Sequence, residues 1–406
     1  MQKVYIQNKD GEPLMPTERC GAVRRWLKQG KAVVINLCPF TIRLNWNAEI
    51  NKQEITVGLD TGTVNIGCAA VSGSNILYAS ETKLRTDIHK KMLRRAMYRR
   101  SRRGRKTRYR QARFNNRTRS EGWLPPTMKS KLDSTVKVVK QLSKILPVSK
   151  VVVEIAKFDI QKLQNPDIKG EQYQKGVTAG YDNVRAYVFE RDRYTCQICK
   201  KTLGILQTHH IKQRKDGGSD QPDNLATVHK TCHEDFHAGR IEHRFRKPKS
   251  YVVPTHVTIL KDFIVAELKK HFDVEVTFGY ITKKNIQRLN LPKSHWSDAV
   301  SICNHSKVNN IDKIFKRVCI TQRRYQMSKG IRSEKKLPVG KLFGFNQWDK
   351  VRFREQIGFI KGRRSSGYFD VCDIDGTSIS HSIKYTLLHR LCSNNIMELL
   401  GNSSPP

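Results

Sequence analysis

Cysteines and histidines crowd into residues 195–237 at spacings that suit metal binding. Cys196 and Cys199 form a C-x-x-C pair, and His229 and Cys232 form an H-x-x-C pair. A structural zinc site takes four such ligands from two short turns, so these four residues are the candidate zinc ligands. The alternative is that both pairs are reduced side chains in turns held by packing alone.

The same stretch holds four more histidines and an asparagine that could act on a phosphodiester. Adjacent residues on a strand point to opposite faces, so one of His209 and His210 can face a divalent metal while the other takes a proton from water. His233 and His237 lie four residues apart, on one face of a helix, like other metal-binding pairs. Asn224 would fix the backbone or the imidazole of the base. Such a set can hydrolyse a phosphodiester with one metal ion.

A second group of candidates is spread along the chain. Asp60 ends an apolar strand, Glu154 lies in the apolar run VVVEI, and His295 and Asp298 share one face at the start of a helix. Three carboxylates at one sheet edge would hold two divalent ions about 3.5–4 Å apart for in-line displacement at phosphorus. Asp60 alone could instead cap a turn. Glu154 is harder to explain structurally, because an unpaired acid in an apolar run is costly.

The net charge of the chain favours a polyanionic partner. Its 406 residues include 76 Lys and Arg against 36 Asp and Glu, a net charge of +40. Nucleic acid fits this excess, since each neutralised phosphate releases counterions. No apolar run is long enough to cross a membrane, and residues 1–16 contain no export signal. Ten cysteines without such a signal indicate thiols and metal ligands, and a cytoplasmic location.

The most basic segment is residues 83–119, which contain 17 Lys or Arg among 37 residues and one acid, Asp87. It contains no proline, and along a phosphate backbone it would form a long helix with a thin apolar seam at Leu93 and Met97. Arginine suits bidentate phosphate contacts. The candidate nucleic-acid ligands are Arg94, Arg95, Arg99, Arg100, Arg102, Arg103, Arg105, Arg108, Arg110 and Arg113.

Hydrophobic periodicity predicts an α/β protein. Predicted strands cover residues 4–7, 32–37, 55–60, 151–155 and 274–278. Predicted helices cover residues 17–29, 131–146, 183–191 and 257–272, and another begins at Ser294. From about residue 340 on, short apolar segments split by glycine-containing turns predict a small β-rich domain.

The metal-binding stretch resembles the HNH, or ββα-metal, nucleases. The pattern C-x₂-C, HH-I, GG, NL and C-H-x₃-H is matched over residues 196–237. The resemblance implies that His210 is the general base and that His209, His233 and His237 bind one catalytic Mg²⁺. His229 departs from it, since many such domains have cysteine there.

The scattered residues resemble the three split motifs of a RuvC, RNase H-like nuclease. These are D-T-G-x₄-G from Asp60, the strand Glu154, and H-x-x-D-A from His295. With an Arg-rich bridge helix after the first motif, an HNH module after the second and PLMP at residues 13–16, the chain resembles the IscB family, transposon-encoded RNA-guided nucleases related to type II CRISPR effectors. The resemblance implies two Mg²⁺ held by Asp60, Glu154 and Asp298, with His295 also catalytic.

The resemblance also implies a domain order. The expected fold is an RNase H-like mixed sheet split in sequence, with an inserted HNH domain and a β-rich C-terminal domain. The expected domains are a PLMP domain (1–52), RuvC-I (53–82), the bridge helix (83–122), RuvC-II (123–164), linkers with the HNH domain (165–250), RuvC-III (251–310) and a domain that reads a target-adjacent motif (311–406).

The function implied is RNA-guided cleavage of double-stranded DNA by a single protein chain in complex with a guide RNA (omega RNA). The HNH site would cut the guide-paired strand and the RuvC site the displaced strand. The compartment would be the bacterial cytoplasm, at the nucleoid when DNA is bound. Two alternatives are a stand-alone endonuclease without a guide and a guide-bound DNA-binding protein that does not cut.

Overall fold

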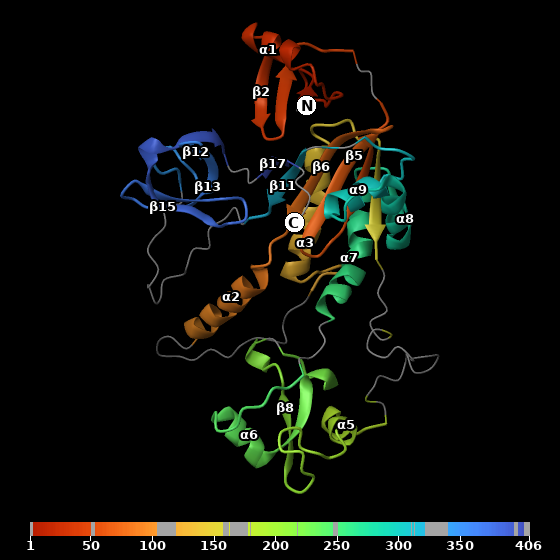
Figure 1. Cartoon of the computed structure of the whole chain (residues 1–406), viewed down its shortest axis with the longest axis vertical. Coiled ribbons are helices and arrows are strands. Elements are labelled where there is room, and N and C mark those ends of the chain that lie inside the picture. The colour runs from red at the N-terminus through yellow and green to blue at the C-terminus, as the bar shows by residue number, and fades with distance from the viewer. Residues whose placement is uncertain are drawn as a thin grey trace. The chain divides into compact units, whose positions relative to one another are not determined.

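The structure is a computed structural model, and Figure 1 shows its elements. It describes residues 3–49, 53–103, 119–156, 162, 178, 180–216, 218–246, 251–309, 311, 313–320, 340–393 and 397–401. The chain forms two compact units, one of residues 1–156 with 256–406 and one of residues 157–255. The predicted α/β class is confirmed, since both units combine helices with sheets.

The larger unit contains a mixed seven-stranded sheet in the order β10-β7-β4-β5-β6-β11-β17. Within it, β4 (Thr56–Asp60) pairs parallel with β7 (Lys150–Ile155) and antiparallel with the central strand β5 (Asn65–Ser72). The other strands are β6 (Asn75–Lys83), β10 (Val274–Phe278), β11 (Lys313–Val318) and β17 (Met397–Gly401). Segments from five distant parts of the sequence therefore meet in one sheet.

Helices bury both faces of this sheet, which explains why its central strands are continuous apolar runs. On one face, Leu59 packs in a cluster with Val136 of α3 (Pro126–Leu142) and Leu268 of α7 (Val252–Lys269). On the other face, Val71 packs with residues of α9 (His295–Ile302). Figure 1 shows α9 and α8 (Gly279–Leu289) beside the sheet.

Several helices differ from the prediction. α7 begins at Val252, five residues before the predicted start, and ends three residues before the predicted end. α3 begins at Pro126, five residues before the predicted start, because proline suits the first helical turn and does not end a helix there. α8 was not predicted, since Gly279 follows β10 directly and reads as a turn residue. The predicted basic helix is α2 (Ile88–Arg103) over the residues that the structure describes.

The smaller sheets of this unit lie at the two ends of the sequence. The N-terminal sheet has the order β1-β3-β2, with β1 (Tyr5–Gln7), β2 (Ala32–Leu37) and β3 (Phe40–Leu44), and it is joined by α1 (Cys20–Lys28). The C-terminal sheet has the order β15-β14-β13-β12-β16. Its strands are β12 (Lys350–Phe353), β13 (Gln356–Arg363), β14 (Tyr368–Cys372), β15 (Ser378–Lys384) and β16 (His389–Cys392).

The expected C-terminal domain of residues 311–406 is therefore too long at both ends. β11 pairs parallel with β6, and β17 pairs antiparallel with β11, so both strands belong to the seven-stranded sheet. The C-terminal sheet itself spans residues 350–392. Strand pairing over more than 200 residues of sequence leaves no local signal, which is why the boundary was misplaced.

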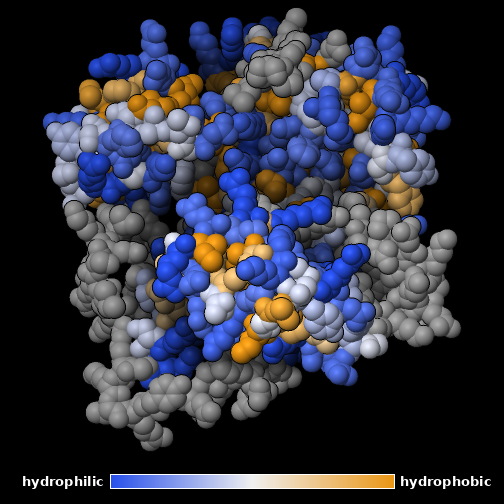
Figure 2. Space-filling model, turned by 60° about the horizontal axis from the view of Figure 1, so that its bottom comes forward, coloured by the Kyte–Doolittle hydropathy of each residue, from blue (hydrophilic) through white to orange (hydrophobic). Residues whose placement is uncertain are grey.

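The smaller unit is built on a hairpin of β8 (Leu206–His210) and β9 (Leu225–His229). Helix α5 (Val184–Arg191) precedes the hairpin and α6 (Lys230–His237) follows it directly. On the face that Figure 2 shows, most of the coloured residues are hydrophilic, and apolar residues form scattered patches. Among the described residues, no helix is long and apolar enough to cross a membrane.

Candidate metal sites

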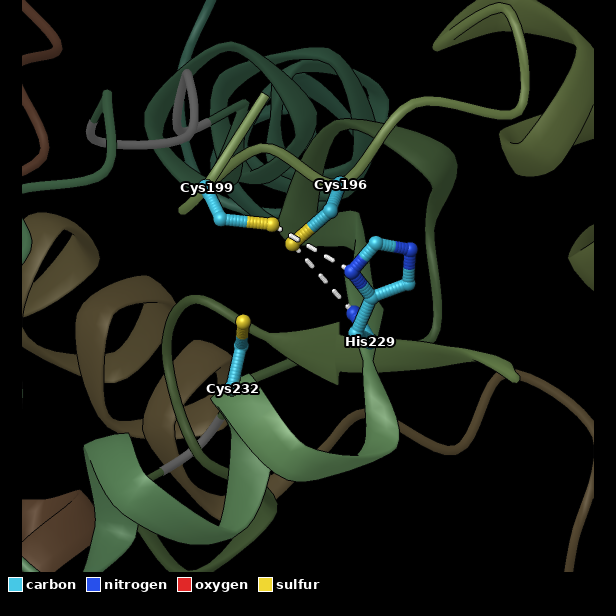
Figure 3. Close-up of side chains that lie close together, drawn as sticks. All are labelled: Cys196, Cys199, His229 and Cys232. Atoms are coloured by element: carbon cyan, nitrogen blue, oxygen red, sulfur yellow. Dashed lines mark hydrogen bonds between the residues drawn. The ribbon is translucent and has the colours of Figure 1, made fainter. Parts of the chain in front are cut away.

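The four predicted zinc ligands meet in the smaller unit. Cys196 and Cys199 lie in the turn after α5, His229 ends β9 and Cys232 lies in the first turn of α6. One donor atom from each lies within 4.8 Å of the others, and Nδ1 of His229 is 3.2 Å from Sγ of Cys199. Figure 3 shows the three sulfurs and the imidazole turned toward one point.

The surroundings of Cys196 favour its thiolate. Burial raises the pKa of Cys196, but backbone N–H groups of Cys199, His229 and Ile198 outweigh burial and lower it below its usual value. The His229 amide nitrogen is 3.3 Å from the Cys196 sulfur. Thiolates and a neutral imidazole are the donors that a tetrahedral zinc site needs, so the set fits zinc. Nδ1 of His229 faces this site at the position where many HNH nucleases have a cysteine.

A second cluster joins His209 of β8 to His233 and His237 of α6. Their ring nitrogens approach within 4.8 Å of one another, and the Nε2 atoms of His233 and His237 are 3.0 Å apart. Burial, with the neighbouring His233 and His237, lowers the pKa of His209 to about 4. Neutral imidazoles bind divalent metal ions, so this set also fits a metal. The rings of Phe245 and Phe236 pack against His209, at 4.9 and 5.2 Å between centroids.

His210 lies outside that cluster, as the alternation along β8 predicts. Its Nε2 is 2.8 Å from Oδ1 of Asp220, which also accepts a hydrogen bond from Nε of Arg214. Hydrogen bonds from Arg214 and His210 lower the pKa of Asp220, so the carboxylate is ionised and only accepts. The proton of a neutral His210 is then on Nε2, and Nδ1 is free to accept. Asp220 is not among the site residues predicted from the sequence.

Asn224 holds the loop that carries Asp220. Its amide nitrogen donates to the carbonyl oxygens of Lys212 (2.9 Å) and Ser219 (2.7 Å), and its Oδ1 accepts from the Lys212 amide. Asn224 is buried, so these bonds are shielded from water. Of the two predicted roles, Asn224 fixes the backbone and does not contact the imidazole of His210.

The third cluster lies at one end of the seven-stranded sheet. Asp60 is the last residue of β4, and Glu154, the next-to-last residue of β7, is its direct neighbour in the parallel pairing. Nδ1 of His295 is 2.7 Å from Oδ2 of Asp60, and the donor atoms of Asp60, His295 and Asp298 lie within 4.8 Å of one another. Four residues from three distant segments therefore converge at one end of the sheet. Carboxylates and an imidazole suit Mg²⁺ or a similar hard cation.

The charges in this cluster are only partly balanced. Burial, and then the carboxylates of Asp60 and Asp298, raise the pKa of Glu154, although Thr282 of α8 donates a hydrogen bond of 2.5 Å to it. Nζ of Lys293 is 3.0 Å from Asp298. The hydrogen bond with Asp60 raises the pKa of His295. A divalent cation would relieve the crowding of negative charge.

Two glycines let α9 reach the sheet. A Cβ on Gly58 of β4 would lie 1.9 Å from the carbonyl oxygen of Ala299, and one on Gly67 of β5 would lie 1.8 Å from that of His295. Ser294 caps α9 through its side chain, which accepts from the amide of Ser297. The glycines and the cap together place His295 beside Asp60.

Comparisons with known proteins agree with the site in the smaller unit. Residues 196–239 match the family described as HNH endonuclease. Anaredoxin of Nostoc sp. is 30% identical over 57 residues, which are 13% of this chain and 75% of that protein. The chain carries an HNH endonuclease domain. The HNH domain contains both the zinc-type cluster and the three-histidine cluster.

Residues 4–176 match a second family, described as RRXRR protein. The pattern in that description occurs here as Arg99-Arg100-Ser101-Arg102-Arg103, within α2. Arg94, Arg95, Arg99 and Arg100 are exposed, and Arg103 is half-buried. The backbone of Arg102 lies in α2, whereas Arg105, Arg108, Arg110 and Arg113 lie outside the described residues.

Two solved structures of Streptococcus thermophilus Cas9, in complex with the AGAA PAM and the AGGA PAM, are similar to this chain. They are 13% and 14% identical, each with a TM-score of 0.31, over 44% of this chain and 26% of theirs. The chain thus spans about a quarter of the length of those Cas9 chains. A TM-score of this size does not establish a shared fold.

Proposed function

We propose that the chain is an RNA-guided DNA endonuclease of the IscB type, with two active sites that each cut one strand. The observation that carries the proposal is that, besides the zinc-type cluster, two clusters of different chemistry that fit a metal lie in separate units. One is the three-histidine cluster of the HNH domain, and the other is the carboxylate cluster around Asp60. Two strands of a duplex run in opposite directions, so two sites of different geometry suit double-strand cleavage.

In the HNH domain, we assign His209, His233 and His237 to one Mg²⁺ and His210 to the general base. The metal, when bound, neutralises charge on the scissile phosphate and the leaving oxygen. His210 takes the proton of the attacking water at Nδ1, since Asp220 holds the other nitrogen in its protonated form. Zn²⁺ at Cys196, Cys199, His229 and Cys232 would hold the first turn, β9 and α6 together.

In the larger unit, we assign Asp60, Glu154 and Asp298 to two Mg²⁺ ions, with His295 as a catalytic partner. The ions supply charge neutralisation on both sides of an in-line displacement. Thr282 orients Glu154, and Lys293 neutralises Asp298. The antiparallel β4-β5-β6 and parallel β4-β7-β10 arrangement supports an RNase H-like, RuvC-type fold.

The net positive charge of the chain supports the proposal that an RNA guides it. A net charge of +40 is larger than a short stretch of DNA would neutralise, so it favours a larger polyanion. The exposed arginines of α2 place part of this charge along one helix. We assign α2 to a guide RNA and the C-terminal β sheet to a short motif next to the target. Base pairing with the guide, rather than protein side chains, would then read the target sequence.

Strand-specific cleavage tests the proposal. The protein is purified with its RNA and given Mg²⁺ and a duplex that matches the guide, with a different label on each strand. Wild type should cut both strands, His210→Ala should leave only the guide-paired strand intact, and Asp60→Ala should leave only the displaced strand intact. Loss of both cuts from either change would contradict two independent sites. Equal cleavage after RNase treatment would contradict guidance but leave a stand-alone endonuclease.

A further inference from the structure

Two large aromatic side chains are exposed next to the carboxylate cluster. Phe278 ends β10 and is 46% exposed, and Tyr280 lies in the first turn of α8 and is 74% exposed. Their rings are nearly parallel, with centroids 6.3 Å apart and an interplanar angle of 9°. Exposed aromatic pairs leave apolar area in water, and such area on a protein surface commonly marks a binding site. Neither ring belongs to an apolar core cluster of the described residues.

The residues around this pair tie it to the active site. Gly279 lies between the two aromatic residues, and a Cβ there would be 3.3 Å from Oε1 of Glu154. Thr277, just before Phe278, is the β10 partner of Glu154 on β7. Thr282, on the buried side of α8, donates its hydrogen bond to the same carboxylate. The backbone that carries the two rings therefore contacts a proposed metal ligand directly.

The outer face of α8 adds positive charge to the aromatic pair. Lys283 and Lys284 follow Tyr280 by three and four residues, so they share its side of the helix, and both are exposed. Neither forms an ion pair with another of the described residues. Aromatic faces next to cationic side chains are the combination that binds single-stranded nucleic acid, since bases stack on the rings and phosphates pair with the charges.

We propose that Phe278 and Tyr280 form a stacking platform for an unpaired base of the strand that the carboxylate cluster cuts. The proposal rests on the proposed nuclease function of that cluster. The ligand is an unpaired base because a base inside a duplex does not offer its face to a side chain. Stacking next to Glu154 would fix the position of the scissile phosphate relative to Asp60, which makes the two aromatic residues positioning residues.

The first test measures stacking directly. Single-stranded DNA with one 2-aminopurine, moved through the sequence one position at a time, is bound to full-length protein carrying Asp60→Asn so that it is not cut. Fluorescence should be quenched at one position close to the cleavage site, and Tyr280→Ala should remove that quenching. Total affinity is a poor readout, because the many other cations of the chain bind DNA in any case.

The second test measures positioning in the active protein with Mg²⁺. Tyr280→Ala should slow cutting of single-stranded DNA about tenfold, the loss expected for one base stack, whereas Tyr280→Phe should keep the wild-type rate. An abasic nucleotide at the quenched position should slow cutting by the wild-type protein by the same factor as Tyr280→Ala does. It should not slow the Tyr280→Ala protein further, because the substitution and the abasic nucleotide remove the same contact. Val276→Ala, on the same edge strand and also exposed, is the matched control.

Two outcomes would overturn the platform and leave the nuclease in place. One is a wild-type rate and wild-type quenching for Tyr280→Leu, which keeps apolar area but no aromatic face. The other is a change of oligomeric state in Phe278→Ala/Tyr280→Ala with unchanged cleavage, which would make the pair a protein contact. If Asp60→Asn cuts single-stranded DNA like wild type, the proposed function of the cluster fails instead.

Discussion

Asp220 shows how one exposed carboxylate can decide the tautomer of the imidazole that we propose as general base, His210. It accepts from Nε2 of His210 and from Arg214, so it selects the tautomer in which Nδ1 accepts a proton. Asp220→Asn can present either an oxygen or an NH₂ group and no longer imposes that choice. We expect cutting by the HNH site to fall about tenfold, as for other groups that orient a reacting residue. A strand-labelled cleavage assay measures this loss.

Only the strand assigned to the HNH site should be affected by Asp220→Asn. Cutting of the other strand is the internal control, and Asp223→Asn, an exposed acid of the same loop, is the matched variant. Unchanged cutting of both strands by Asp220→Asn would remove Asp220 from the mechanism.

His229 allows a sharp test of the zinc-type cluster. Its Nδ1 lies where a fourth sulfur would lie in a four-cysteine site, so His229→Cys should keep about one zinc per chain, while His229→Ala should lose most of it. Zinc is measured by mass spectrometry after the protein is stripped of loosely bound metal and reconstituted with Mg²⁺. Cys20→Ser, outside the cluster, is the control. Wild-type protein that folds with no zinc would contradict the assignment.

The sequence was most informative where a motif is local. Cys196 and Cys199, or His233 and His237, are close in sequence, so turn or helix geometry alone brings their side chains together. Thr282 and Asp220 were missed because their partners, Glu154 and His210, lie 128 and 10 residues away. A threonine or an exposed aspartate has many ordinary uses, and spacing does not single it out.

At the scale of elements, the approach of α9 to the sheet decides whether the carboxylate cluster forms. The Cβ of Gly67→Ala would lie 1.8 Å from the carbonyl oxygen of His295, so α9 must move. We expect unfolding to become easier by about 1–3 kcal/mol, the usual cost of overpacking, and cutting of the displaced strand to be lost. Chemical denaturation and strand-labelled cleavage measure the two effects.

The HNH site lies in the other unit and should keep its activity in Gly67→Ala. Gly21→Ala is the matched control, since its Cβ would meet no described atom within 4 Å other than its chain neighbours and the adjacent backbone of α1, and alanine favours a helix. A stable Gly67→Ala protein that cuts both strands would show that α9 does not depend on this close approach.

Elements with their own periodicity were predictable, and those defined by distant partners were not. β4 and β7 are apolar runs bounded by polar turns, so their positions follow from sequence. α8 carries only two buried residues, Thr282 and Asn285, both polar, so no apolar stripe marks it. β17 is recognisable only through its pairing with β11, which lies about 80 residues earlier. Long-range pairing of that kind is a property of the folded chain.

At the scale of the whole molecule, the topology decides how the carboxylate cluster is assembled, and the net charge decides what the folded chain must bind to be stable. The carboxylate cluster needs segments around residues 60, 154 and 295 to be folded together, and residues 157–255 form their own unit between two of these segments. A net charge of +40 opposes compaction unless counterions or a polyanion offset it. An RNA that stays bound would therefore stabilise the protein as well as direct it.

We expect one structured RNA species, beginning or ending in a variable guide, to co-purify with the protein expressed from its native locus. Sequencing of the bound RNA measures this. In a second measurement, the logarithm of RNA affinity is plotted against the logarithm of salt concentration. Replacing Arg99 and Arg100 of α2 by glutamine should make that slope shallower by about one to two. Lys137→Gln, an exposed cation of α3, is the matched control. A random RNA population would instead favour an endonuclease that selects its DNA without a guide, because nonspecific attraction by charge gives no single species.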